Sequence, residues 1–179
     1  MPPPEPRTGS SRTTPRILWM LAIGLLVLRV AAGWYESRNA PRTVELVEWQ
    51  PIEGSADKAR ASGKPILYDF TADWCPPCHA MAREVFADRK SAATINHLFV
   101  PVRVLDRQRE EGRNSPDVAA LQQRYQVEAF PTLVVVSPGG RPEKIEGYPG
   151  QSKLLEELAR LGVMARMQHG FGGKADSLR

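Results

Sequence analysis

Cysteine and histidine are scarce in this chain, which has two cysteines and three histidines among its 179 residues. A small scaffold held together by disulfides uses more cysteines than this. A closed zinc site takes four ligands, and Cys75, Cys78 and His79 supply only three, since His97 and His169 lie far away in the sequence. The composition argues against a disulfide framework, and we expect no metal site.

Charge of one sign is not in large excess either. Lys and Arg number 24 and Asp and Glu number 20, which gives a formal net charge of +4. This excess is small and scattered, so we expect no nucleic-acid partner. With 42% hydrophobic residues, a chain of this length can bury one good core but hardly two.

What the chain does contain is a closely spaced cysteine pair, in the segment Trp74-Cys75-Pro76-Pro77-Cys78-His79. Two thiols separated by two residues close a small ring that opens readily, which suits thiol–disulfide exchange. The run before it, residues 64–71, predicts a buried strand that leads into a turn and then a helix. The pair is therefore expected where a strand ends and a helix begins.

The N-terminal part carries an apolar run with a basic flank. Residues 17–28 (ILWMLAIGLLVL) are apolar without a break, and three arginines precede them. This order is typical of an export signal. An uncleaved anchor needs about 20 residues, which 17–35 supplies if Arg29 snorkels or faces a partner. A cleaved signal peptide suits the shorter core, with small residues at 30–33 for cleavage.

Both versions place the rest of the chain outside the cytoplasm, because the basic residues stay inside. For a bacterial cell we expect a single-pass inner-membrane protein, held in the membrane by residues 17–35, with its folded domain in the periplasm. The alternative is secretion to the periplasm after signal cleavage. The expected division is 1–16 flexible basic N-terminus, 17–35 signal-anchor or transmembrane segment, 36–43 linker, 44–168 folded domain and 169–179 flexible tail.

The soluble part has the pattern of alternating strands and helices. Strands are predicted at 66–71, 99–105, 131–137 and 143–148, with a turn at 138–140 and with 44–49 as a short strand or leading segment. Helices are predicted at 56–62, 75–86, 89–98 (capped by Asp88), 117–125 and 151–167, and a charged loop at 106–116. This order favours an α/β fold in which helices cover a mixed sheet of four or more strands.

Three stretches carry a resemblance to a known family: Asp69-Phe-Thr-Ala-Asp-Trp-Cys-Pro-Pro-Cys78, Ala129-Phe-Pro-Thr132 and Ser137-Pro-Gly-Gly140. They are similar to the CxxC motif, the cis-proline loop and the hairpin turn of the thioredoxin-like family. The chain looks closest to the branch that contains the C-terminal domain of the membrane disulfide reductase DsbD. The resemblance implies a thioredoxin fold, with a central mixed β-sheet flanked by helices, preceded here by an N-terminal hydrophobic helix.

The resemblance also implies roles in the chemistry. Cys75 would be the attacking nucleophile, because the start of a helix stabilises a thiolate and lowers its pKa. Cys78 would be the resolving thiol, and Asp69 a buried carboxylate that accepts the proton of Cys78. The family often has a lysine near that carboxylate. Our alignment puts Val102 there and points Arg103 to the other face, so no basic partner is expected.

Further residues are expected around the cysteines. The resemblance implies substrate contacts from Trp74, Phe130, Pro131 and Thr132, with the bond before Pro131 in the cis form. Three residues are expected to tune the pair: Pro76, Pro77 and His79. The prolines stiffen the ring and remove two amide donors, and the histidine is close enough to act on Cys75 electrostatically.

Two other classes of function compete with this interpretation. Cys75-Pro-Pro-Cys78-His79 also fits CxxCH, the attachment signature of c-type haem, with His79 as axial ligand. A haem pocket, however, requires neither Asp69 nor the loop around Pro131. A non-catalytic binding module is the other alternative, and the presence of both cysteines argues against it.

We therefore expect an exported thiol–disulfide oxidoreductase that exchanges its Cys75–Cys78 dithiol or disulfide with client proteins bearing disulfides or thiols. We expect no cofactor besides this redox-active disulfide. The resemblance to the DsbD branch implies net reduction, which in an oxidising compartment needs a membrane electron donor of the DsbD type. Net oxidation or isomerisation by the same residues is the alternative, because cysteine spacing does not fix a redox potential.

Overall fold

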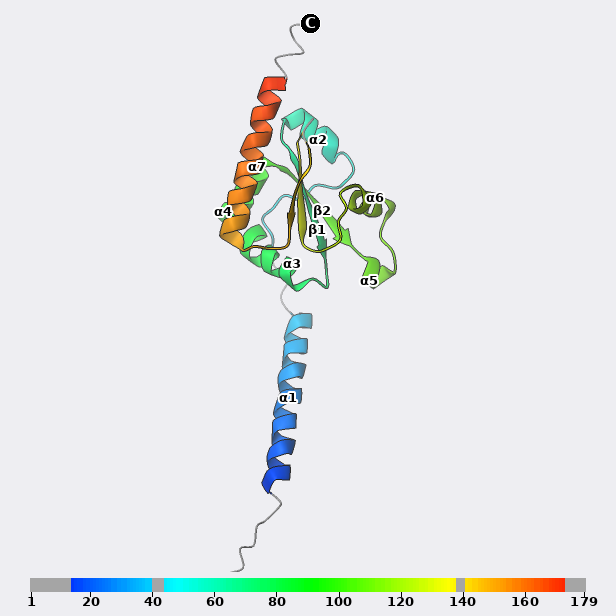
Figure 1. Ribbon diagram of the computed structural model, residues 1–179, viewed down its shortest axis with the longest axis vertical. Helices are drawn as coiled ribbons and strands as arrows, with labels where there is room; N and C mark the ends of the chain where they lie inside the picture. Colours follow the sequence, from blue (N-terminus) through cyan, green and yellow to red (C-terminus); the bar gives the residue numbers. More distant parts are fainter. Residues whose placement is uncertain (1–13, 40–43, 138–140, 173–179) are drawn as a thin grey trace, which may run out of the picture. The chain divides into compact units, whose positions relative to one another are not determined.

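A computed structural model describes residues 14–39, 44–137 and 141–172, and the chain divides into two compact units, 1–42 and 43–179 (Figure 1). The described part of the first unit is the helix α1 (Thr14–Asn39), so residues 36–39 of the predicted linker are helical. Large apolar side chains along α1, from Leu18 to Val30, are exposed. Over the described residues, no helix meets the length and apolarity required for crossing a membrane.

The second unit is built on a four-stranded mixed sheet in the order β2-β1-β3-β4. The strands are β1 (Ile66–Ala72), β2 (Val100–Asp106), β3 (Thr132–Val136) and β4 (Glu143–Glu146). β1 pairs parallel with β2 and antiparallel with β3, and β3 pairs antiparallel with β4. The thioredoxin fold predicted from the sequence, with its mixed sheet, is confirmed.

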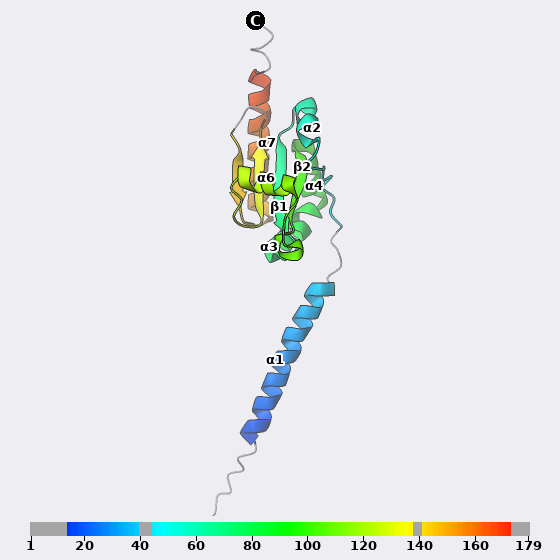
Figure 2. The ribbon, with the colours of Figure 1, turned by 90° about the vertical axis from the view of Figure 1, so that its right-hand side faces the viewer.

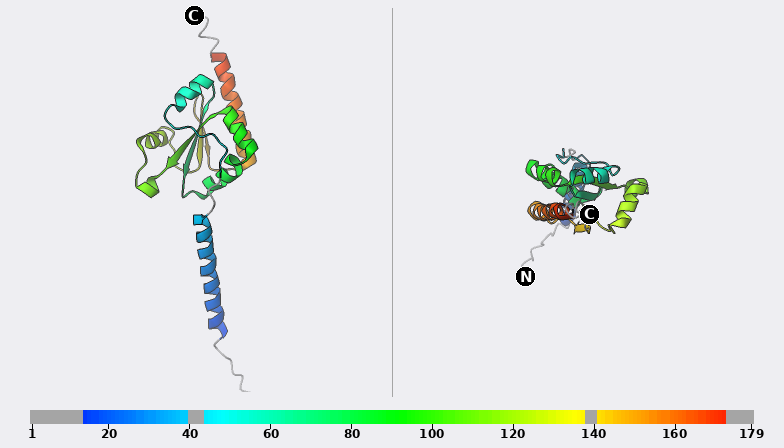
Figure 3. Two further views of the ribbon diagram at one scale, coloured as in Figure 1. Left: turned by 180° about the vertical axis from the view of Figure 1, so that it is seen from behind. Right: turned by 90° about the horizontal axis from the view of Figure 1, so that it is seen from above.

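Helices cover both faces of this sheet. They are α2 (Ser55–Ser62), α3 (Pro76–Met81) with the π-helical turn η1 (Ala82–Phe86), α4 (Arg89–Leu98), α5 (Gln108–Glu111), α6 (Pro116–Arg124) and α7 (Gln151–Gly172). Seen from above, α4 and α7 lie on one side of the sheet and α6 on the other (Figure 3). As predicted, Asp88 caps α4, its Oδ1 accepting from the Ser91 amide at 2.9 Å.

The central strand β1 is buried on both faces because each face has its own apolar cluster. Leu67 packs with side chains of α3, η1, α4 and α7, whereas Tyr68 and Phe70 pack with side chains of α2 and α6. Side chains alternate between the two faces of a strand, so Asp69 lies on the face of Leu67. That is the face covered by α3, the helix that carries Cys78.

Some predicted boundaries differ from the structure. Residues 44–49 form no strand, and one isolated bridge, Gln50 to Val102, joins this leading segment (residues 44–50) to β2. The predicted charged loop contains α5, and α7 runs past 167 to Gly172. The predicted turn at 138–140 and the flexible ends at 1–13 and 173–179 lie outside the described residues.

Candidate active site

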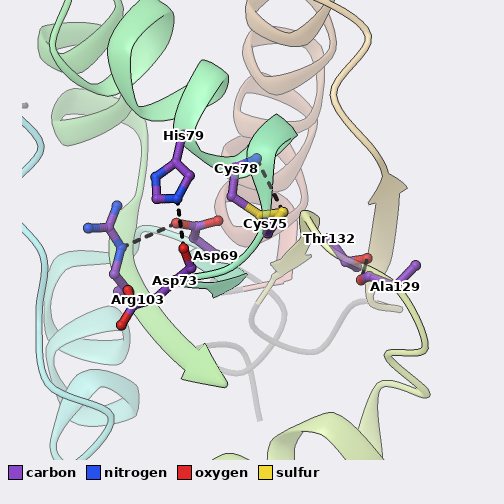
Figure 4. The surroundings of a disulfide bond; sticks show 8 residues. All are labelled: Asp69, Asp73, Cys75, Cys78, His79, Arg103, Ala129 and Thr132. Carbon is purple, nitrogen blue, oxygen red and sulfur yellow. Dashed lines mark hydrogen bonds and ion pairs between the residues drawn. A yellow bond between two sulfur atoms is a disulfide. The ribbon is translucent and has the colours of Figure 1, made fainter. Parts of the chain in front are cut away.

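Cys75 and Cys78 form a disulfide at the point where β1 leads into α3 (Figures 2 and 4). Cys75 is the N-cap of α3, and its Sγ accepts a hydrogen bond from the Cys78 amide at 3.2 Å. Both cysteines are buried, 1% and 4% exposed. The sequence pattern of a strand, a turn and a helix around this pair is therefore confirmed, and the sulfurs lie in an apolar setting.

Pro76 and Pro77 occupy the first two positions of α3, where a helix has no internal partner for its amides. Neither proline carries an N–H that could donate to a sulfur. Among the described residues, the Cys78 amide is the group that donates a hydrogen bond to Cys75 Sγ. The Cys75 amide itself donates to the Ala72 carbonyl at 3.1 Å. This geometry limits how many backbone donors can stabilise a thiolate here. That the prolines tune the pair stays a prediction.

Asp69 is a buried carboxylate, 1% exposed. Burial raises its pKa from 3.8 to about 6, while the neighbouring Arg103 lowers it in part and Glu45 adds to the rise. Its Oδ1 has no hydrogen-bond partner among the described residues. In Figure 4 the other oxygen is joined to Arg103, and Oδ1 lies on the side of the disulfide. The carboxylate is thus poised to bind a proton near neutral pH.

The prediction that Asp69 lacks a basic partner is wrong. In the parallel pairing of β1 with β2, Asp69 lies opposite Arg103, whereas Val102 lies opposite Tyr68. Arg103 Nε donates to Asp69 Oδ2 at 3.3 Å. Our alignment placed the register one residue too early, and such a slip moves every side chain of a strand to the other face.

Glu45 in the leading segment holds Arg103 from its far end. Arg103 Nη1 and Nη2 donate to the two Glu45 oxygens at 3.0 and 2.6 Å, a bidentate pair. The Arg103 guanidinium also lies 4.1 Å from the ring centroid of Trp49, whose Nε1 donates to Glu45 at 2.7 Å. No sequence pattern predicts this group, because it joins a segment and two strands that lie far apart in sequence.

The aromatic rings of Trp74 and Phe130 pack together next to the cysteine turn. Their ring centroids lie 5.8 Å apart in an edge-to-face arrangement, and Phe130 packs against the cluster formed by Ala72, Cys75 and Cys78. The Phe130–Pro131 peptide bond is cis, as expected. Thr132 is buried, and its hydroxyl donates to the Ala129 carbonyl at 2.8 Å (Figure 4). Its side chain is therefore engaged within the loop.

His79 points back to the turn before the cysteines. Its Nε2 lies 2.7 Å from the Asp73 carbonyl oxygen, which can only accept, so Nε2 carries the proton that is donated (Figure 4). The ring thereby ties the second turn of α3 to the loop that positions Cys75. Its electrostatic effect on Cys75 stays a prediction.

The charged loop at 106–115 also reaches this site, and its contacts were not predicted from the sequence. Arg107 Nη1 lies 3.4 Å from Asp73 Oδ2, and the Arg109 guanidinium lies 3.5 Å from the ring centroid of Trp74. The sequence shows that this loop is rich in charged residues, but no sequence pattern indicates that Arg107 and Arg109 face the cysteine turn.

Metal binding and haem attachment would both draw on side chains of this site. In the part of the chain that the structure describes, no three His, Cys, Asp or Glu side chains are grouped to hold a metal ion. The two cysteine sulfurs are bonded to each other. That the chain carries no haem and no metal stays a prediction.

A cysteine pair at the start of a helix, a buried carboxylate behind it and a cis-proline loop beside it, on this fold, define a thiol–disulfide oxidoreductase. Residues 52–162 match the family model of the thioredoxin-like domain, which covers more than half of the chain. The chain belongs to the thioredoxin-like family.

Curated relatives agree with this assignment. Thioredoxin Y2 of Arabidopsis thaliana is 27% identical over 122 residues, covering 68% of this chain and 66% of the relative. Thioredoxin of Mycobacterium tuberculosis is 33% identical over 102 residues, 55% of this chain and 75% of the relative. The thiol:disulfide interchange protein DsbD of Yersinia pestis is 25% identical over 149 residues, 79% of this chain. The chain spans only 24% of DsbD's length.

Solved structures show the same fold. A thioredoxin from Thermus thermophilus superposes with a TM-score of 0.54 at 25% identity, covering 66% of this chain and 89% of that one. The oxidised C-terminal domain of DsbD from Neisseria meningitidis gives a TM-score of 0.50 at 23% identity, covering 60% and 89%.

Proposed function

We propose that this chain is an exported, membrane-tethered thiol–disulfide oxidoreductase that reduces disulfides in client proteins and is itself recharged by a membrane electron donor. The observation that carries the proposal is the Cys75–Cys78 disulfide beside the buried carboxylate of Asp69. The thioredoxin-like family supplies the class of reaction.

In the reduced protein, the Cys75 thiolate attacks one sulfur of a client disulfide. The client S–S bond breaks, a bond forms between Cys75 Sγ and the client sulfur, and the other client sulfur leaves as a thiolate. Cys78 then attacks Cys75 Sγ, which re-forms the Cys75–Cys78 bond and releases the second client sulfur. The client gains two electrons and two protons, and this chain loses them.

Asp69 serves the second step of this exchange. Cys78 has to lose its proton to attack, and a carboxylate with a pKa of about 6 is mostly ionised at pH 7 and able to take it. The Oδ1 atom is the candidate acceptor, because it has no hydrogen-bond partner within the described residues. Arg103 holds the other oxygen and fixes the orientation of the carboxylate.

The likeness to DsbD supports the direction and the electron source. The DsbD of Yersinia pestis is a thiol:disulfide interchange protein, and the match covers most of this chain. Net reduction uses up the Cys75–Cys78 dithiol at each turnover. A dithiol carried by a membrane protein of the DsbD kind would restore it, and the dithiol of that donor would become oxidised.

The N-terminal region supports export and attachment. Arginines precede an apolar run at 17–28, and large apolar side chains of α1 from Leu18 to Val30 are exposed. A helix that exposes apolar side chains in this way needs an apolar surrounding. We propose that the membrane supplies it, that the domain at 44–168 lies in the periplasm, and that signal cleavage is the alternative.

Trapping of a mixed disulfide tests the exchange chemistry. Reduced full-length protein is mixed with a disulfide-bonded peptide, and adducts are followed by mass spectrometry. Cys78→Ser should accumulate a Cys75–peptide adduct, because nothing resolves it, while Cys75→Ser should form none. Wild type should release reduced peptide without an accumulated adduct. An adduct on Cys78 in the Cys75→Ser variant at the wild-type rate would reverse the assigned roles.

The reduction potential of the Cys75–Cys78 pair tests the direction. Equilibration in dithiothreitol or glutathione buffers should give a value near about −270 mV, as for a thioredoxin reductant. A value near about −120 mV would make the chain an oxidant of client thiols. An absorbance scan belongs to the same experiment, because a Soret band in the purified protein would replace the dithiol interpretation by the haem one.

A further inference from the structure

The loop at residues 106–115 is firmly anchored at its base. Asp106, buried at the end of β2, accepts hydrogen bonds at Oδ2 from Asn114 Nδ2 at 2.6 Å and from Gln122 Nε2 at 2.8 Å. Asn114 Oδ1 accepts from the Arg107 amide at 2.6 Å, which closes the loop on itself. Although burial raises the pKa of Asp106, the hydrogen bonds from Gln122, Asn114 and the Gln108 amide, together with the charge of Arg109, outweigh it and lower the pKa. The loop is therefore held as a charged, preformed structure.

The anchored loop lies at the same end of the sheet as α3 and contacts the cysteine turn (Figures 1 and 2). Arg107 pairs with Asp73, and Arg109 stacks on Trp74, the residue that directly precedes Cys75. Trp74 is 38% exposed in spite of this stacking. A client that reaches Cys75 has to come close to Trp74 and hence to Arg109.

The two arginines differ in how their charges are compensated. Arg107 lies near two carboxylates, Asp73 at 3.4 Å and Glu111 at 3.8 Å. For Arg109, no carboxylate of the described residues lies within ion-pair distance, and the acidic group that its charge affects is Asp106, at the base of the loop. A guanidinium stacked on an indole keeps its in-plane N–H donors, and those donors match the two oxygens of a carboxylate.

We propose that the 106–115 loop is part of the client-binding surface and that Arg109 selects clients with an acidic side chain near the reacting cysteine. The inference rests on the proposed exchange at Cys75. Because Arg109 stacks on the residue that directly precedes Cys75, the acidic side chain belongs close in sequence to the client cysteine. The client is thus a polypeptide with Asp or Glu close to its disulfide.

Three disulfide-bonded peptides test this selection, identical except for Glu, Gln or Lys two positions from the cysteine. The measured quantity is the ratio of second-order reduction rates, Glu over Lys, for the reduced full-length protein at low salt. Wild type should prefer the Glu peptide about three- to fivefold, the size of an exposed ion pair, and salt should weaken the preference. Arg109→Gln should bring the ratio to about one, and Arg109→Glu should invert it.

Arg113→Gln is the matched control, because it removes the same charge from the same loop at a position with no recorded contact to the cysteine turn. It should keep the wild-type ratio. If Arg109→Gln slows all three peptides equally and leaves the ratio unchanged, Arg109 only packs against Trp74 and the inference is wrong. If the wild type reduces none of the peptides, the proposed function itself fails, which is a different result from reduction of all three without preference.

Discussion

Asp69 is the residue at which stability and chemistry conflict. Its carboxylate is 1% exposed, and one of its oxygens lacks a hydrogen-bond partner among the described residues. An ionised carboxylate in such a place costs free energy of folding, because water can no longer solvate it. A proton acceptor behind Cys78 nevertheless has to be ionised at working pH. The partial compensation by Arg103 lets both conditions hold.

Replacement of Asp69 by asparagine should stabilise the oxidised protein at neutral pH. The pKa of Asp69 is about 6 when folded and 3.8 in the unfolded chain, so ionisation favours unfolding. Stability should fall as the pH rises from about 4 to about 6 and stay about 3 kcal/mol lower above that range. Asp69→Asn removes this loss, and urea unfolding at pH 7 should show most of that gain.

The same comparison at pH 4 is the control, because Asp69 is already largely protonated there in the folded state. The advantage of Asp69→Asn should shrink to well below 1 kcal/mol. An equal gain at both pH values would mean that folding does not raise the pKa of Asp69. Client reduction by the variant should also be slower, about tenfold or more near pH 7, because the proton acceptor is lost.

At the scale of elements, β2 supplies Arg103 and the leading segment (residues 44–50) holds this arginine against Asp69 of β1. Glu45 binds this arginine bidentately, and Trp49 stacks on it, so its Nε reaches Asp69 in a fixed direction. The charged groups facing Asp69 are Arg103 from β2, Glu45 from the leading segment and the cysteine pair of α3 when reduced. The proton affinity of the site is therefore set partly by a segment outside the sheet.

Substitutions of Arg103 and Glu45 should shift the pKa of Asp69 in opposite directions. Arg103→Met removes the charge that lowers this pKa and should raise it above about 6, whereas Glu45→Gln removes a charge that raises it and should lower it. A ¹³C NMR titration of the Asp69 carboxyl in the oxidised protein measures both. If the two variants shift the pKa the same way, Glu45 acts by positioning Arg103 rather than by its own charge.

The packing of α7 on α4 gives a second element-level prediction. A Cβ at Gly162 would lie 3.1 Å from Phe99 and 3.2 Å from Leu98, closer than ordinary contact. Gly162→Ala gains about 1 kcal/mol in helix propensity but overpacks this contact at a cost of about 1–3 kcal/mol. We expect a net loss near 1 kcal/mol in urea unfolding, while Ser152→Ala at the exposed start of α7 should change stability by under about 0.5 kcal/mol. A stabilised Gly162→Ala would show that the two helices move apart readily.

Local sequence patterns were enough to predict the helices and strands, but they were not enough to predict how the strands pair. The β-branched run of β3, the cap at Asp88 and the turn around Cys75 each follow from neighbours in sequence. The pairing of Asp69 with Arg103 depends on where β2 begins, and a one-residue error inverts the faces. The contact of Arg109 with Trp74 depends on how a loop folds back, which no periodicity encodes.

On the scale of the whole molecule, the redox site belongs to one of two units. Every residue of the three apolar clusters lies at or beyond Val47, within the unit at 43–179. The disulfide, Asp69 and the residues that hold it belong to the same unit. The first unit contributes the helix α1, whose large apolar side chains from Leu18 to Val30 are exposed. Redox chemistry and attachment are therefore expected to be separable.

Removal of residues 1–42 tests this separation. The free energy of unfolding of the fragment 43–179 should lie within about 0.5 kcal/mol of that of the full chain, and the fragment should reduce peptide disulfides at the same rate. The reason is that the three apolar clusters and the redox site lie entirely within the fragment. A larger loss of stability would mean that the two units support each other.

Expression of the full chain in bacteria, followed by N-terminal sequencing of the membrane and periplasmic fractions, decides between anchor and cleaved signal. We expect an intact N-terminus in the membrane fraction that resists alkaline extraction. This result follows if residues 17–35 stay in the membrane as an uncleaved anchor with the preceding arginines on the cytoplasmic side. A soluble periplasmic form that begins near Gly33 would instead establish cleavage. In that case the electron donor has to meet a freely diffusing domain, and the rate of recharging should depend on its concentration. An intact chain in the cytosol would contradict both versions of export and, with them, the need for a membrane donor.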